Sequence, residues 1–212
     1  MNRGDLRALV REHVNEPTAG FWSDAQLNIY LNLAKDQVTA FMVRLDEDFF
    51  ELSATFTTAV GTKSYLLPAD AMQVNRIERY TTADAYDITM LEPVGHHLLG
   101  RNGYPFGSNN KPDYYDVRGV QFDLYPTPDA IYPMRLYYDQ RQADMSQDSD
   151  VPGHPREAHP LIAARAAKMA LTKQGDTGEA VKELIGDLED TLSGWLTGRR
   201  GSVATTVAGY ME

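Results

Sequence analysis

An apolar seam along residues 27–45 narrows the possible folds more than any other feature of the sequence. Its apolar side chains recur at alternating spacings of four and three residues, at Leu27, Leu31, Ala34, Val38, Phe41 and Leu45. This spacing predicts a helix of about six turns with one face suited to packing on another helix. Ser23, with Gln26 three residues later, has the pattern of a capping box and marks the start of that helix.

Helical patterns are present at both ends of the chain. Residues 1–48 contain the seam and, before it, apolar residues with helical spacing at Leu6, Leu9, Val10 and Val14. Residues 161–198 contain an alanine-rich run that Gly175 closes, and then an apolar stripe at Val181, Leu184, Ile185, Leu188, Leu192 and Trp195. Asp176 with Glu179 resembles a capping box for the last helix. Because each helical pair is small, we expect the two pairs to join in one four-helix bundle.

Residues 49–141 are instead rich in β-branched and aromatic residues, with frequent Gly and Pro. Strands are predicted where side chains alternate, as in Phe50, Leu52, Ala54, Phe56 and Thr58. Residues 114–125 predict a tight hairpin, and residues 100–112 predict a long loop. The predicted fold class is therefore α+β: a four-helix bundle with an inserted antiparallel β module. A linker is expected at 142–160 and an extended C-terminal arm at 199–212.

Composition excludes several functions. The chain has no cysteine, which excludes disulfides, thiolate zinc sites and cysteine nucleophiles. Lys and Arg number 20 against 30 Asp and Glu, a net charge of −10, whereas proteins that grip nucleic acid usually have the opposite balance. No apolar stretch approaches the ~20 residues of a membrane span, so we expect no membrane contact. The N-terminus also lacks the apolar region of a signal peptide.

The motifs that carry chemistry are absent or incomplete. The five histidines lack metal-ligand spacing, so His154 and His159 are predicted to be solvated loop residues. Residues 144–155 loosely resemble a calcium loop, but Ser149 and Pro155 stand where the loop needs Gly and Glu. A solvated acidic linker is the favoured interpretation. No phosphate-binding glycine loop and no serine nucleophile elbow is found, so we predict no enzymatic activity, cofactor or metal.

Tyrosines are concentrated in the β-rich segment, where nine of the twelve lie between residues 80 and 138. They could stack on bases, but Lys and Arg are sparse among them. Tyrosine is also typical of protein interfaces, which is the interpretation we favour. The candidates for a subunit interface are Tyr114, Tyr115, Tyr125, Tyr137 and Tyr138.

Residues 199–212 show little periodicity and cannot bury themselves alone. A frayed terminus is the simplest interpretation. The alternative is an arm that becomes ordered on a partner, by strand addition or by docking in a groove.

An ordered set of sequence motifs carries a family resemblance. It begins with Trp22-Ser23-Asp24-Ala25-Gln26-Leu27 and Tyr30-Leu31-Asn32-Leu33-Ala34. It continues with Ser64-Tyr65-Leu66-Leu67-Pro68-Ala69-Asp70, Val74-Asn75-Arg76-Ile77 and Pro112-Asp113-Tyr114-Tyr115. It ends with Gly119-Val120-Gln121-Phe122-Asp123-Leu124-Tyr125-Pro126-Thr127-Pro128, Leu136-Tyr137-Tyr138 and Pro160-Leu161-Ile162. In this order the motifs resemble the head-to-tail adaptor proteins, or portal-bound connectors, of short-tailed bacteriophages.

The resemblance implies a structural virion protein of the head–tail junction, assembled in the host cytoplasm. Such adaptors form a ring, here expected to have twelve copies, that docks under the portal protein and holds the tail or nozzle proteins. Genomic DNA passes through the ring without specific binding, and a net-acidic lumen suits that role because it repels phosphate. The resemblance also implies that the C-terminal arm binds the portal, through Arg199, Arg200, Val203, Thr205, Val207, Tyr210 and Met211.

Two other functions remain open at this point. A glycan- or peptide-binding module of a phage tail would also use a β module on a helical stalk. A hydrolase would need a nucleophile or paired acids, which the sequence does not display.

Overall fold

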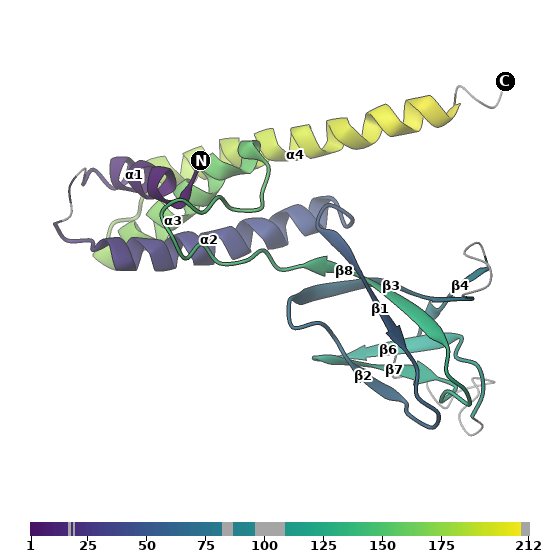
Figure 1. Cartoon of the computed structure of the whole chain (residues 1–212). Helices are drawn as coiled ribbons and strands as arrows, with labels where there is room; N and C mark the ends of the chain where they lie inside the picture. Colours follow the sequence, from purple (N-terminus) through teal and green to yellow (C-terminus); the bar gives the residue numbers. More distant parts are fainter. Residues whose placement is uncertain (17, 19, 82–86, 96–108, 209–212) are drawn as a thin grey trace. The chain divides into compact units, whose positions relative to one another are not determined.

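A computed structural model describes residues 1–16, 18, 20–81, 87–95 and 109–208, with side chains up to residue 199. The chain divides into two compact units (Figure 1). The helical unit combines Met1–Asp46 with Gln142–Glu212, and the β unit is Glu47–Arg141. Two N-terminal and two C-terminal helices pack together, and two small sheets are inserted between them in the sequence. The predicted α+β fold class is therefore confirmed.

The N-terminal pair consists of α1 (Arg3–His13) and α2 (Asp24–Leu45). The capping box of Ser23 and Gln26 forms as predicted. The first four positions of the seam are fully buried, but Phe41 is only half-buried and Leu45 is exposed. Met42 is buried in their place. A repeat of 3.5 residues drifts around a helix of 3.6 residues per turn, so the last turns of the seam rotate away from the core.

The C-terminal pair consists of α3 (His159–Gln174), which follows a short 3₁₀ turn η2 (Arg156–Ala158), and α4 (Glu179–Ala208). Helix α3 contacts the other three helices. Small side chains allow this close approach, and fully buried alanines are found at Ala163, Ala164, Ala166, Ala167 and Ala170. Gly175 ends α3 in the left-handed conformation, with φ 87°.

Both ends of α4 differ from the prediction. Asp176 does not cap the helix through a capping box; its Oδ1 accepts the N–H of Gly178 at 2.9 Å, and α4 begins at Glu179. At the other end, the helix continues through Ala208, beyond the predicted boundary at residue 198. Glycines and β-branched residues are poor helix formers, but a helix that has already nucleated can extend through them. An extended conformation is therefore wrong for residues 199–208, and Tyr210 and Met211 lie outside the described residues.

The β unit contains two four-stranded sheets. The first has the order β1 (Glu51–Thr57), β8 (Pro133–Gln140), β3 (Ala71–Tyr80) and β4 (Ile88–Met90). The second has the order β2 (Ser64–Leu66), β7 (Gln121–Tyr125), β6 (Tyr114–Arg118) and β5 (Glu92–Pro93). All neighbours are antiparallel except β5 and β6. The predicted hairpin forms between β6 and β7, where Gly119 has a φ of 58°.

Aromatic and aliphatic side chains from both sheets form the core of the β unit. Phe122 on β7 lies at its centre, with ring centroids 5.4 Å from Phe56 and 5.7 Å from Tyr65. The other buried members are Ile77, Leu91, Tyr115, Leu124, Met134, Leu136 and Tyr138. Most of the predicted loop, residues 100–108, lies outside the described residues.

Candidate functional site

A fully buried lysine fixes the segment before α3 on α2. The Nζ of Lys35 donates to the carbonyl of Gln142 at 2.6 Å and to that of Ala143 at 3.2 Å. It also lies 2.8 Å from Oδ1 of Asp144. These three acceptors match the three protons of the ammonium group, so the buried charge has a structural role. Residues 142–144 are therefore fixed on α2 by this contact, while Ala143 and Asp144 stay exposed to solvent, as expected of a solvated linker.

Both histidines of this segment are buried, which corrects their prediction as solvated residues. His154 Nε2 lies 2.9 Å from the hydroxyl of Thr39 on α2. Burial, and secondarily the charge of Lys35, lowers the pKa of His154 to about 4. His159 lies 2.8 Å from the N-terminal ammonium of Met1, and burial together with that charge lowers its pKa. Neutral imidazoles at these positions join α1, α2 and α3.

The acidic residues of the same segment are engaged by the protein itself. Arg3 and Arg7 of α1 each place Nη2 2.7 Å from a different oxygen of Asp148. Hydrogen bonds from Arg7 and Arg3 hold the pKa of Asp148 well below its usual range. Asp150 Oδ2 accepts two backbone N–H groups of its own loop at 2.7 Å. Asp148 therefore holds α1 in place, and Asp150 stabilises its own loop. Neither carboxylate is arranged as a ligand of a calcium ion.

Across the residues that the structure describes, no group of three or more His, Asp or Glu side chains is placed to hold a metal ion. His96 and His97 lie outside that part of the chain. A search of the described helices also finds none that is long and apolar enough to cross a bilayer.

Three of the five interface tyrosines lie inside the β unit. Tyr115 and Tyr138 belong to its core and are 5% and 3% exposed. Tyr125 is buried beneath Lys63, whose Nζ lies 4.1 Å from the ring centroid, and its hydroxyl accepts a hydrogen bond from Arg118 Nη2 at 2.9 Å. These three residues are not available to a neighbouring subunit, which corrects their assignment. Sequence alternation could not reveal the burial of Tyr125, because both faces of β7 are buried.

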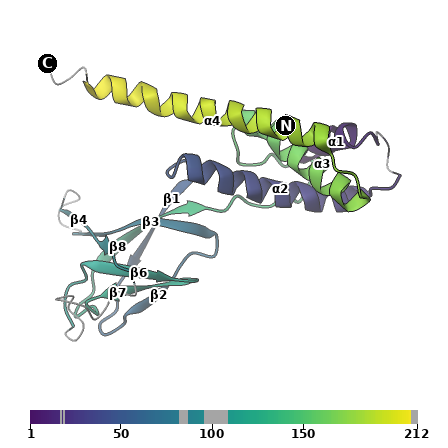
Figure 2. The same cartoon turned by 180° about the vertical axis from the view of Figure 1, so that it is seen from behind.

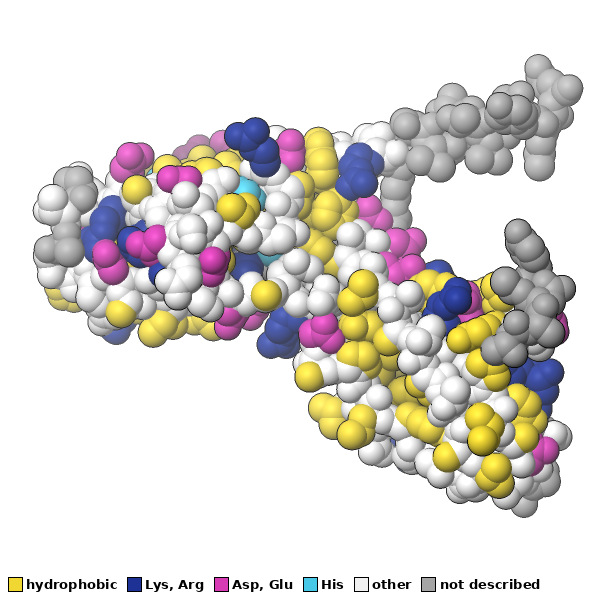
Figure 3. All heavy atoms as spheres, in the orientation of Figure 1, with side chains coloured by type: hydrophobic (Ala, Val, Ile, Leu, Met, Phe, Trp, Pro, Cys, Tyr) yellow, Lys and Arg dark blue, Asp and Glu magenta, His cyan; other side chains and the backbone are white. Residues whose placement is uncertain are grey.

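The other two candidates, Tyr114 and Tyr137, are half-buried and remain predictions. The guanidinium of Arg76 lies 3.6 Å from the ring centroid of Tyr137 and covers one of its faces. The most exposed apolar side chains of the β unit are found elsewhere. Leu66 and Val120 are each 76% exposed, and the carbonyl of Val120 accepts the N–H of the residue after Leu66, so the two lie together at one edge of the second sheet. Figure 3 shows hydrophobic side chains gathered over this unit.

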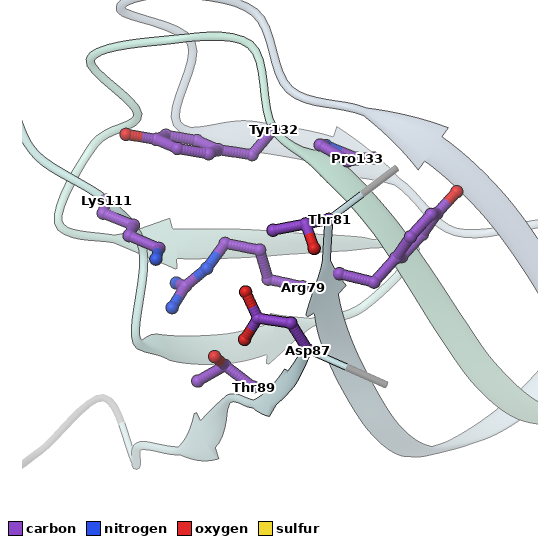
Figure 4. Close-up of a pocket in the computed structure, with 8 residues that line it drawn as sticks. Arg79, Thr81, Asp87, Thr89, Lys111, Tyr132 and Pro133 are labelled. Atoms are coloured by element: carbon purple, nitrogen blue, oxygen red, sulfur yellow. The ribbon is translucent and has the colours of Figure 1, made fainter. Parts of the chain in front are cut away.

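A pocket of about 250 Å³ opens in the β unit beside the end of β3 (Figure 4). Its central side chain is Arg79, which is buried and donates to the carbonyl of Pro112 and to Asp113 Oδ1. The hydroxyl of Tyr132, which forms one wall, donates to Asp129 at 2.6 Å. The pocket is smaller than most ligand sites, and these polar groups are already satisfied. The arrangement favours a structural role in holding residues 112 and 113.

A larger groove, of about 580 Å³, lies over α3 between α2 and α4. Met169 and Ile185 supply apolar parts of its lining, and basic side chains come from α3. The lining residues are Gln37, Arg165, Lys168, Met169, Thr172, Lys173, Ile185 and Glu189. Sequence analysis missed this groove because the alanines dominate the α3 segment. The signal was present, however, since Arg165, Lys168 and Thr172 have the spacing of one helical face.

The C-terminal part of α4 is a second candidate site in the helical unit. Leu192 and Leu196 are its last buried side chains among those described. Trp195 is only half-buried, and the guanidinium of Arg199 lies 5.2 Å from its ring centroid. Figures 1 and 2 show the yellow end of α4 running past the other helices of this unit. One end of the predicted portal-binding segment is thus a continuation of a packed helix.

A search of curated proteins found no match. The sequence model of one family, described as SU10 adaptor protein, matches residues 1–206. The match covers every helix and strand that the structure describes, apart from the last residues of α4. It confirms the resemblance to phage head-to-tail adaptors that the sequence motifs suggested. The chain belongs to the SU10 adaptor protein family, a family of phage head-to-tail adaptors.

Proposed function

We propose that this chain is a structural protein of the virion that forms a ring at the head–tail junction. The ring docks under the portal, provides the attachment platform for tail components and lets genomic DNA pass. Membership of the adaptor family supplies the general role, with portal and tail proteins as partners. The projecting end of α4 is the observation that carries the specific proposal.

The helix continues for 12 residues, 197–208, after Leu196, which is the last buried side chain among those that the structure describes. At ~1.5 Å per residue this is roughly 18 Å of helix. Such a segment can dock in a groove of a partner without disturbing the bundle behind it. We assign portal binding to Arg199, Arg200, Val203, Thr205 and Val207, continued by Tyr210 and Met211.

The proposal of a ring is based on symmetry, and the proposal of DNA passage is based on charge. A closed ring needs two different surfaces on each copy. We assign Tyr114 and Tyr137 to a contact between copies, and the exposed pair Leu66 and Val120 to a tail component. A net charge of −10 keeps the lumen from holding DNA, because phosphate is repelled and not bound. Twelve copies is the ring size that we expect.

The experiment is reconstitution with the cognate portal. Full-length protein should co-sediment with portal rings and add a collar that is visible by electron microscopy. Deletion of residues 199–212 removes no side chain that the structure shows buried, so the melting temperature should stay unchanged while portal binding is lost. Deletion of 209–212 alone is the matched control for a shortened terminus. Full-length protein that stays monomeric and ignores the portal would refute the proposed function.

A glycan- or peptide-binding module is the alternative function, and the pocket in Figure 4 is the place where its ligand would bind. The existing bonds of Arg79 and Tyr132 weigh against it. A glycan array probed with the full chain separates the two functions, because an adaptor should bind no glycan. Specific binding that is lost on Tyr132→Ala would favour the alternative.

A further inference from the structure

We propose that the groove over α3 receives the acidic outer face of α4 from a second copy of this chain. This contact between copies rests on the proposed ring. It names the residues that would join neighbouring subunits. For the experiment below, the groove is represented by Lys168 and Lys173, and the acidic face by Glu183, Asp187 and Asp190.

The groove presents positive charge that no carboxylate of the described residues neutralises, although Lys173 Nζ also lies 5.6 Å from the ring centroid of Trp22. Lys168 is half-buried and Lys173 is exposed, and neither has an ion-pair partner among the described residues. Arg165 is already engaged, with Nη2 2.5 Å from Glu189 on the rim. Met169 and Ile185 contribute the apolar part of the lining. A well-matched occupant would therefore be acidic.

The outer face of α4 is acidic and also carries two glycines. Glu183, Asp187 and Asp190 follow one another at spacings of four and three, and all three are exposed. Gly186 and Gly194 lie on the same face, and a Cβ atom placed on either one would meet nothing within 4 Å. Each glycine inside a helix costs about 1 kcal/mol relative to alanine, and this chain's own packing does not require either one. A closely approaching neighbour would account for them.

The groove and the acidic face lie on different sides of α4. Their placement determines the symmetry of the contact between copies. Ile185 and Glu189 face the groove, whereas the acidic face points away from it. One copy can therefore fill a neighbour's groove while its own groove is filled by the next copy. Such a head-to-tail contact does not stop at a dimer, and it forms the proposed ring when its rotation closes. Nucleic acid is a poorer occupant, because two unpaired cations in a chain of charge −10 supply little attraction for phosphate.

Charge reversal in two separate proteins tests the pairing. The groove variant is Lys168→Glu/Lys173→Glu, and the face variant is Glu183→Lys/Asp187→Lys. Each variant alone should assemble on portal rings about tenfold less than wild type, because like charges then meet at every contact. An equimolar mixture should recover assembly, since every contact in an alternating ring then joins opposite charges. Arg44→Glu/Arg156→Glu and Glu12→Lys/Glu157→Lys are controls with the same changes of net charge at exposed sites elsewhere.

Each outcome decides between the hypotheses. Normal assembly by either variant alone, or failure of the mixture to recover, overturns the pairing even if wild type assembles on the portal. Failure of wild type to bind the portal counts against the proposed function instead. A second readout then tests the pairing by itself: the chain has no cysteine, so oxidation of a mixture of Lys173→Cys and Asp187→Cys at high concentration should give the mixed disulfide dimer. No such dimer above the level of a Glu12→Cys control would overturn it.

Discussion

Replacing Lys35 by methionine should destabilise the helical unit by about 3 kcal/mol. The substitution keeps the length of the side chain but removes the ammonium that holds residues 142–144 on α2. The carbonyls of Gln142 and Ala143 lose charge-assisted hydrogen bonds, each worth about 1.5–3 kcal/mol. Asp144 is 70% exposed, so water replaces its lost contact at little cost. Relief of the buried charge offsets part of the loss, which brings the net change to about 3 kcal/mol.

Urea unfolding followed by tryptophan fluorescence measures this change. The chain has two tryptophans, Trp22 and Trp195, and both belong to the helical unit, so their fluorescence reports on that unit. With a slope of ~2 kcal/mol per molar urea, the midpoint should fall by about 1.5 M. Lys182→Met, at an exposed position of α4, should leave the midpoint unchanged. A Lys35→Met midpoint within about 0.3 M of wild type would refute the argument that the lysine holds the segment.

Three further predictions concern protonation and packing. The pKa of His154 is lowered to about 4 in the folded state, so the protein should lose up to ~3 kcal/mol of stability as the pH falls from about 6.5 to 4. His154→Gln should reduce this dependence of stability on pH, as measured by urea unfolding at several pH values. Burial, together with the carboxylates of Asp48, Glu51 and Glu47, raises the pKa of Asp139 to about 6, so Asp139→Asn should stabilise the β unit by about 1–3 kcal/mol at pH 8. That gain should vanish below pH 4 when near-UV circular dichroism follows the tyrosines; an equal gain at both pH values would contradict it. Trp195→Ala should lower the free energy of unfolding by about 1–2 kcal/mol, because the side chain is half-buried. Leu192→Ala, in the core, should lower it by about 2–5 kcal/mol. If thermal melts show the opposite order, the tryptophan is the better buried of the two.

The sequence could predict features that depend on residues close together in the chain. The capping box of Ser23 and the left-handed glycines at 119 and 175 depend on neighbours a few residues away. Contacts between distant segments were not predictable in this way. The acidic run around Asp148 resembles a solvated linker until Arg3 and Arg7, about 140 positions earlier, are placed against it. Tyr115 and Tyr138 resemble interface residues until two sheets close over them.

The candidate surfaces also differ in whether nearby residues or distant segments form them. The terminal segment was identified from its composition, but its helical form was not, because propensity alone ends the helix at the glycines. The groove over α3 is formed by three helices, and no single one of them displays it. Its basic residues became recognisable only when the buried alanines had fixed the face of α3 that remains open.

The division of the helical unit between the two ends of the chain also affects its synthesis on the ribosome. Helix α2 ends at Leu45, and α3, which covers its apolar face, begins at His159. At roughly 5–20 residues per second, translation leaves that face without its cover for about 6–23 s, while the whole β unit is made. A nascent chain in this interval is a natural client for a holding chaperone. Fragments truncated before α3 have no route to a complete bundle, so they are excluded from any collar of finished subunits.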